Sequence, residues 1–147
     1  MRALIQRVSQ ANVKIDEKII SEIKQGLLVL VCAMADDTEI EAEQMASKIS
    51  KIRIFNDENG KMNNSIKDIN GEALVVSQFT LAADTSRGNR PGFSYAAHPE
   101  KGEKLYEYFT TKLQDMDINC KMGVFGGDME VSLINDGPTT IWLDNKD

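Results

Sequence analysis

Apolar and polar positions alternate along the first fifteen residues, first over 4–8 and again over 13–15. A period of two is typical of a strand, so this segment predicts two strands joined near Ser9-Gln10. Ile residues at 19–23 predict a short third strand. Residues 27–31 form an unbroken apolar run, which is typical of a central strand buried on both faces.

Apolar residues recur at helical spacing in two later segments. Thr38 is followed three residues later by Glu41, which is the spacing of a capping box, so one helix is predicted to begin there. The second helix is predicted to begin at Pro99, because the first helical turn tolerates proline. The predicted inward faces are Ile40, Met45, Ile49 and Ile52 for the first helix, and Leu105, Tyr108, Phe109 and Leu113 for the second.

Further strand-like segments complete the pattern, and no repeat or linker divides it. They lie near 53–55, at 73–76 running on into 77–81, and near 118–124, 130–134 and 140–143, whereas 62–69 is ambiguous. Strands of mixed type with two main helices predict an α/β or α+β chain. A length of 147 residues fits one compact domain spanning 1–147.

The last predicted strand pair is interrupted by Gly137-Pro138. Proline removes a donor from a strand ladder, and an X-Pro bond can adopt the cis form at little cost. Taken alone, the dipeptide favours a chain reversal between two short strands. The alternative is that this backbone serves a purpose other than pairing with a neighbouring strand.

Composition narrows the function classes. The formal net charge of −6 counts against an extended basic groove for nucleic acid. It still allows the protein to bind the end of an RNA through a few local contacts. No stretch is long and apolar enough to span a bilayer, so we expect a cytoplasmic protein with no membrane partner. Cys32 and Cys120 are isolated, which argues against a zinc knuckle or a disulfide framework.

Common catalytic sets are poorly represented. His98, the only histidine, lies in a predicted loop, and no nucleophile elbow, phosphate loop or metal-binding cluster is visible, so no metal and no cofactor is expected. The leading candidate is 77–80, because small polar residues at the end of an apolar strand suit a site built from main-chain N–H donors. In the plainer interpretation Ser77 and Thr80 close a strand, Gln78 faces solvent and Phe79 is core.

Two segments together resemble a known family. Ser77-Gln78-Phe79-Thr80-Leu81 and Asn135-Asp136-Gly137-Pro138 are similar to the two signature motifs of the D-aminoacyl-tRNA deacylases. The resemblance covers almost the whole chain, including 1–8, 26–31, 53–55 and 123–126. The sequence departs from the family pattern at Thr139, where the family usually has Val, and at Gly92, where Ser is common. Both differences concern the details of the pocket.

The resemblance implies hydrolysis of the ester at the 3′ end of a D-aminoacyl-tRNA by a barrel-like α/β domain. It implies a homodimer in which the Gly137-Pro138 segment of one subunit completes the pocket of the other. It assigns the catalytic site to Ser77, Gln78, Phe79 and Thr80, and substrate binding to Gly137, Pro138, Arg7, Phe125 and Met129.

The protein is then expected to distinguish D- from L-aminoacyl groups by excluding the L form from the pocket. Carbonyl oxygens of a cis Gly137-Pro138 unit would form a wall that the β-carbon of an L residue strikes and a D residue avoids. Glycine lacks a β-carbon, so glycyl-tRNA is expected to be cleaved as well.

Two chemical routes stay open. Either Thr80 acts as nucleophile or positions water, or the 2′-OH of the terminal adenosine assists while the protein supplies shape and N–H donors. The second is favoured because Thr80 has no evident base.

Several other residues carry paired interpretations. Arg7 either holds the Gly-Pro loop or pairs with a carboxylate on a strand face, and Phe125 either stacks on adenine or belongs to the core. Five cationic residues are candidates to bind tRNA phosphates: Lys48, Lys51, Arg53, Arg87 and Arg90. In the alternative interpretation each is an ordinary solvated charge. A competing class is a non-enzymatic RNA-binding or scaffold module, which release of amino acid from D-tyrosyl-tRNA would exclude.

Overall fold

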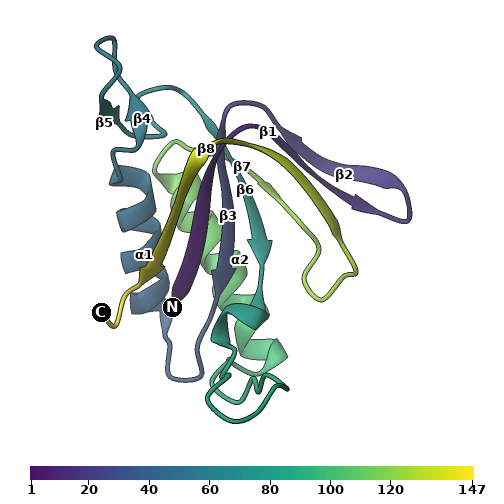
Figure 1. The fold of residues 1–147 in the computed structure, drawn as a ribbon. Coiled ribbons are helices and arrows are strands. Elements are labelled where there is room, and N and C mark those ends of the chain that lie inside the picture. Colours follow the sequence, from purple (N-terminus) through teal and green to yellow (C-terminus); the bar gives the residue numbers. More distant parts are fainter.

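The computed structural model describes all residues from 1 to 147 (Figure 1). Eight strands, two α-helices and one 3₁₀ helix, η1, make up the fold. In chain order they are β1 (Arg2–Ile15), β2 (Lys18–Ile23), β3 (Gly26–Cys32), α1 (Glu39–Lys51), β4 (Phe55–Asn56), β5 (Met62–Asn64), β6 (Glu72–Ser77), η1 (Phe79–Ala82), α2 (Pro99–Asp115), β7 (Asn119–Met122) and β8 (Glu130–Asp144).

A six-stranded mixed sheet forms the centre of the molecule. Its order is β2-β1-β3-β6-β7, and β8 pairs with β1 along almost the full length of both strands. β4 and β5 form a separate small hairpin beyond the end of α1 (Figure 1). β3, β6 and β7 are parallel neighbours, whereas β1 is antiparallel to β2, β3 and β8.

β1 is one continuous strand, so the predicted break near Ser9-Gln10 is wrong. Its first half pairs with β3 and its second half with β2, while β8 follows it throughout. Ser9 and Gln10 lie instead where the register between β1 and β8 shifts. A shift of this kind bends a strand without ending it, and the sheet curves here into its barrel-like form (Figure 1).

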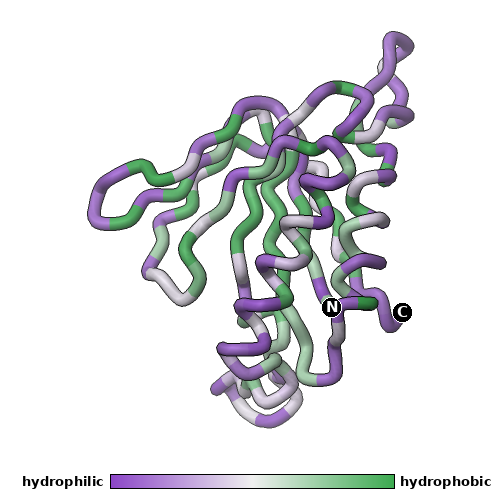
Figure 2. Tube along the Cα trace, turned by 180° about the vertical axis from the view of Figure 1, so that it is seen from behind, coloured by the Kyte–Doolittle hydropathy of each residue, from purple (hydrophilic) through white to green (hydrophobic).

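Both helices pack on one face of the sheet and leave the other face to the bent half of β1 and its neighbours (Figure 1). Twenty buried residues lie between sheet and helices, and seven more fill the curved side. Figure 2, seen from behind, shows hydrophobic strands lying behind helices that turn many hydrophilic residues outward. This arrangement follows from strands buried on both faces and helices buried on one.

The predicted start of α1 is confirmed. Thr38 is the N-cap, its hydroxyl accepts from the N–H of Ile40 at 3.2 Å, and its own N–H donates to the Glu41 carboxylate at 2.6 Å. The predicted inward face is only partly right: Met45 and Ile49 are buried, whereas Ile40 is 62% exposed. Ile40 lies in the first turn of the helix. In α2, Tyr106 is buried whereas Tyr108 is only half-buried.

β8 runs through the Gly-Pro segment without a chain reversal, so the simple turn between two strands is wrong. Gln6 pairs with Thr140 and Val8 with Asn135, which leaves 136–139 as a bulge opposite Arg7. The amide of Asn135 donates to the carbonyls of Arg7 and Thr139, both at 3.0 Å, and so closes the bulge. The peptide between Gly137 and Pro138 is cis, and both residues are exposed.

These findings confirm an α/β fold with a barrel-like mixed sheet and two main helices. None of its helices has the length and apolar character to cross a membrane.

Candidate active site

A pocket of about 760 Å³ opens where the central strands β3 and β6 end. Val31, Cys32 and Ala33 line it from the end of β3, and Val76, Ser77, Gln78 and Phe79 from the end of β6. The opposite wall comes from 93–99, the first two turns of α2 and 125–131. The pocket therefore gathers segments that are far apart in the sequence at one edge of the sheet.

Parallel pairing explains why the ends of β3 and β6 meet here. Val31 is the register partner of Ser77, and the N–H of Gln78 extends the ladder to the Val31 carbonyl at 2.8 Å. The chain then leaves the sheet and forms η1, so Phe79 and Thr80 are not extended as the sequence predicted. The turn carries Phe79 out of the core: its ring is 58% exposed and packs edge-on against Phe93 at 5.1 Å.

The start of η1 leaves two main-chain donors unused. Its hydrogen bonds run from Leu81 to Gln78 at 3.2 Å and from Ala83 to Thr80 at 3.1 Å, and no hydrogen bond in the chain engages the N–H groups of Phe79 or Thr80. The first N–H groups of any helix lack partners within the helix. Beside a pocket, such a pair can stabilise negative charge that develops on a carbonyl oxygen.

The side chains of the signature segment offer no base. The Thr80 hydroxyl accepts a hydrogen bond from the Gln78 amide at 2.5 Å, and an amide cannot take up a proton. Both groups lie at the exposed rim, and Thr80 itself does not line the pocket. Ser77 lines the pocket and is half-buried.

Cys32 is a buried residue at the end of β3 and lies in the pocket wall. Burial raises the pKa of its thiol to about 11, although the positive charge of Arg2 opposes the shift. A thiol with this pKa is protonated at neutral pH, and the thiolate is the reactive form. Cys32 therefore contributes shape to the pocket.

Phe125 and Met129 line the far wall. The Phe125 ring lies 6.0 Å from the Tyr106 ring and packs against the main core, so it is both partly core and partly pocket. Met129 lies over Gly123, where an added β-carbon would come within 2.7 Å of the methionine sulfur. The absence of a side chain at Gly123 thus makes room for Met129.

Arg7 is buried away from the pocket and ties two segments together. Its guanidinium donates to the carbonyl of Ile54 at 2.6 Å and to the carbonyl of Asp136 at 2.9 Å. The same group lies 3.2 Å from the Asp136 carboxylate. Arg7 therefore contacts the Gly-Pro loop, and the carboxylate that it meets belongs to that loop rather than to a separate strand face.

The structure brings Ser77, Gln78, Phe79, Phe125 and Met129 together but leaves Arg7, Gly137 and Pro138 elsewhere. None of those three lines the pocket of its own chain. Sequence reasoning also missed pocket residues at 93–102, among them His98, which precedes the first turn of α2. The available signal was Pro99, since a helix start fixes where the preceding loop must lie.

Known proteins match the chain over nearly its full length. A family model described as D-Tyr-tRNA(Tyr) deacylase matches residues 4–144. A Ruegeria pomeroyi protein named D-aminoacyl-tRNA deacylase is 60% identical over 144 residues, covering 98% of this chain and 99% of that protein. A Thermotoga petrophila protein of the same name is 54% identical, covering 99% and 98%.

Solved structures share the fold. One titled c-Myc DNA Unwinding Element Binding Protein has a TM-score of 0.93 and 40% identity, covering 98% of both chains. Another, titled as a probable eukaryotic D-amino acid tRNA deacylase, has a TM-score of 0.84 at 15% identity over 97% of both chains, and shows the fold alone. The fold and the sequence matches define an enzyme of the tRNA deacylase class, a hydrolase of esters on tRNA. Within that class, the chain belongs to the D-Tyr-tRNA(Tyr) deacylase family.

Proposed function

We propose that this protein hydrolyses the ester between a D-amino acid and the 3′-terminal adenosine of a tRNA, and that it works in the cytoplasm. The observation that carries the proposal is the pair of unengaged N–H groups at Phe79 and Thr80, beside a pocket that holds no activated nucleophile. Water attacks the ester carbonyl, the two donors stabilise the oxyanion, and the products are a free D-amino acid and the tRNA 3′-hydroxyl. Losing one such donor typically costs about 100- to 1000-fold in rate.

In this mechanism the substrate assists its own hydrolysis through the 2′-OH of the terminal adenosine. The Thr80 hydroxyl is supported as a binding group only, because its partner is an amide and its position is at the rim. Gln78 and Thr80 are then placed to hold the ribose or the ester. Phe125 and Met129 form the wall against which the adenosine lies.

The pocket is proposed to be completed by a second copy of the chain. Gly137 and Pro138 are exposed, although the bulge that carries them is held by the buried Arg7 and by Asn135. A rigid, exposed segment that does not line its own pocket is suited to enter the pocket of a partner. The assembly is then a homodimer with two composite sites.

Chirality is proposed to be read by the main chain of that segment. Carbonyl oxygens of Gly137 and Pro138 face the α-carbon of the substrate and accept hydrogen bonds from its ammonium group. A D residue turns only hydrogen toward them, whereas an L residue drives its β-carbon into them. Glycyl-tRNA passes this filter and is cleaved.

Release of amino acid from D-tyrosyl-, L-tyrosyl- and glycyl-tRNA tests the activity. The first and third are expected to be cleaved and the second spared. Failure to cleave D-tyrosyl-tRNA would leave the non-enzymatic RNA-binding alternative standing.

The chemical route is tested with Thr80→Ala and with a tRNA that ends in 2′-deoxyadenosine. The deoxy substrate is expected to lose most of its cleavage, whereas Thr80→Ala retains part. Abolition of activity by Thr80→Ala alone would instead assign the chemistry to the threonine. Sedimentation equilibrium tests the dimer directly.

A further inference from the structure

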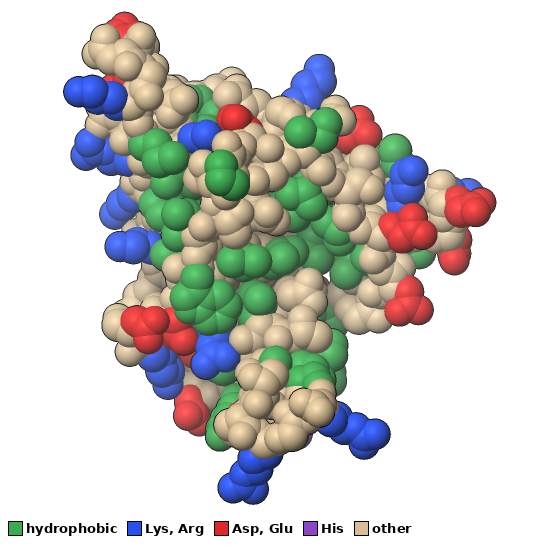
Figure 3. All heavy atoms as spheres, in the orientation of Figure 1, with side chains coloured by type: hydrophobic (Ala, Val, Ile, Leu, Met, Phe, Trp, Pro, Cys, Tyr) green, Lys and Arg blue, Asp and Glu red, His purple; other side chains and the backbone are tan.

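A positively charged surface lies outside the pocket, on an otherwise acidic protein. Four cationic side chains at the end of α1 and on the β4–β5 hairpin form it, and we call them the basic edge: Lys48, Lys51, Arg53 and Lys61. Figure 3 shows Lys and Arg side chains gathered along the left-hand side, over α1 and this hairpin. All four are exposed, although the whole chain carries a net charge of −6.

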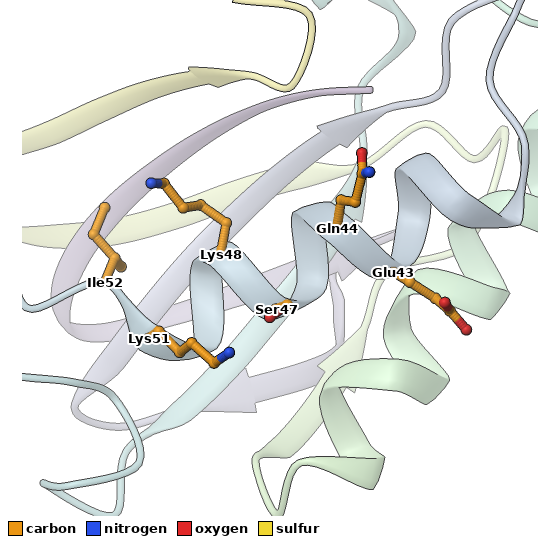
Figure 4. A pocket seen from close by; sticks show the side chains of 6 residues that line it. All are labelled: Glu43, Gln44, Ser47, Lys48, Lys51 and Ile52. Carbon is orange, nitrogen blue, oxygen red and sulfur yellow. The ribbon is translucent and has the colours of Figure 1, made fainter.

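The lysines of the basic edge are free to bind an anion. Lys48, Lys51 and Lys61 take part in no ion pair, unlike Lys67, Lys104 and Lys112. Figure 4 shows Lys48 and Lys51 extending from successive turns of α1, while Glu43 points away toward α2. Residues three apart on a helix are surface neighbours. Both lysines line the same shallow hollow beside α1, although their ammonium groups point in different directions (Figure 4).

Two of the nearby carboxylates, those of Glu43 and Asp57, are already engaged, whereas the exposed Glu58 of the hairpin has no partner. Glu43 accepts from the Tyr108 hydroxyl at 2.6 Å and pairs with Lys112 at 3.2 Å. Asp57 accepts the N–H groups of Asn59 and Lys61 at 2.8 and 3.0 Å, which lowers its pKa and keeps it turned into its own loop. The positive charge of the basic edge is therefore not cancelled by these groups.

The basic edge lies next to the Gly-Pro bulge. Arg7 joins the bulge to the α1–β4 connection, because its guanidinium donates both to Asp136 and to Ile54, which follows Arg53. No residue of α1 or of the β4–β5 hairpin lines the pocket of the same chain. If the bulge enters the pocket of a partner, it carries the basic edge toward that pocket.

We propose that the basic edge of one subunit binds backbone phosphates of the tRNA whose 3′ end lies in the pocket of the other subunit. The inference rests on the proposed function and on its composite site. A phosphodiester backbone is the partner that suits exposed lysines that take part in no ion pair. It also explains how an acidic protein holds a polyanion through a few local contacts.

The first experiment compares two substrates, D-tyrosyl-tRNA and D-tyrosyl-adenosine, which lacks the phosphates beyond the terminal nucleoside. In Lys48→Glu/Lys51→Glu, the ratio of kcat/KM for the tRNA to that for the nucleoside is expected to fall about tenfold or more at low salt. The slope of log KM against log salt should flatten by about 1.5 to 2. The neutral pair Lys48→Gln/Lys51→Gln should show a smaller change in the same direction.

Lys24→Glu/Lys121→Glu is the matched control. It makes the same change in net charge with two exposed, unpaired lysines, one in the β2–β3 connection and one on β7, away from α1. An equal fall in the control would mean a general charge effect, and an unchanged ratio in Lys48→Glu/Lys51→Glu would mean no phosphate contact; either overturns the proposal. Absence of cleavage of both substrates by the wild-type protein would instead refute the proposed function.

Mixed dimers decide which pocket the basic edge serves. One dimer joins a wild-type chain to a chain that carries both Lys48→Glu/Lys51→Glu and a pocket-inactivating change; the other distributes the two changes between the chains. Binding in trans predicts that the first is impaired on tRNA and the second is active. The reverse result would assign the basic edge to its own pocket and overturn the trans arrangement, and sedimentation would show separately whether a dimer forms.

Discussion

The guanidinium of Arg7 donates to the main-chain carbonyl of Asp136 at 2.9 Å and lies 3.2 Å from the carboxylate of the same residue. One buried side chain thus contacts both the main chain and the carboxylate of the residue that precedes Gly137. The bulge is exposed at its tip and anchored at its base, as a segment that meets another molecule requires.

Substitution of Arg7 by Lys should weaken the fold and loosen the bulge. A single ammonium cannot reproduce the guanidinium fork that reaches Ile54 and Asp136, so one buried carbonyl loses its partner. The expected loss in the free energy of unfolding is about 1–3 kcal/mol, measured by urea denaturation. Cleavage of L-tyrosyl-tRNA relative to D-tyrosyl-tRNA should also rise.

Gln6→Ala is the control for this prediction, because Gln6 is the neighbouring residue on β1 and makes only an exposed contact of 3.4 Å to Thr140. It should leave stability within about 0.5 kcal/mol of wild type. Equal stability of the Arg7→Lys protein and wild type would contradict the anchoring role.

Arg2 is expected to position η1. Its Nη1 donates to the Leu81 carbonyl at 2.9 Å, and its Nε donates to Asp144 at 3.0 Å, so it links the turn that carries Phe79 and Thr80 to the end of β8. Arg2→Lys keeps the charge but loses the two-point geometry. Because a small misplacement of donors is costly, kcat should fall about tenfold or more, with a smaller change in KM. An unchanged kcat would show that η1 holds its position without Arg2.

Gly26 should tolerate no side chain. A β-carbon there would lie 1.8 Å from the carbonyl oxygen of Glu72, its parallel partner in β6. Gly26→Ala must push β3 and β6 apart and is expected to cost about 3 kcal/mol or more, or to prevent soluble expression. Gly92→Ala, with nothing within 4 Å of the added carbon, is the matched control and should express and unfold as wild type does.

The two cysteines should make the fold sensitive to alkaline pH. Burial raises the pKa of Cys32 to about 11 and that of Cys120 to about 12, against an ordinary value near 9. Between about pH 9 and 11 the unfolded chain loses these protons while the folded chain keeps them, so the free energy of unfolding falls as pH rises. In Cys32→Ala the fall should be shallower, measured by urea denaturation with a reducing agent. Parallel pH profiles for the two proteins would contradict the assignment.

Local chemistry in the sequence was sufficient for much of the fold. The capping box at Thr38 and Glu41 fixed where α1 begins, because its hydrogen bonds join residues only three apart. The apolar runs in β3 and β6 predicted strands that are buried on both faces. The order of the signature motifs predicted the family, which the comparisons confirm.

Tertiary structure decided what depends on distant partners. Ser9-Gln10 and Gly137-Pro138 both look like strand ends, yet β1 and β8 continue through them because each supplies the other with a long ladder that absorbs a register shift. The pocket likewise exists only because parallel pairing of Val31 with Ser77 brings two strand ends together and α2 begins opposite them. Local periodicity does not encode which remote segments pair or in what register. The sequence by itself therefore determined most of the helices and strands, and the hydrogen-bonded pairing of those strands determined the site.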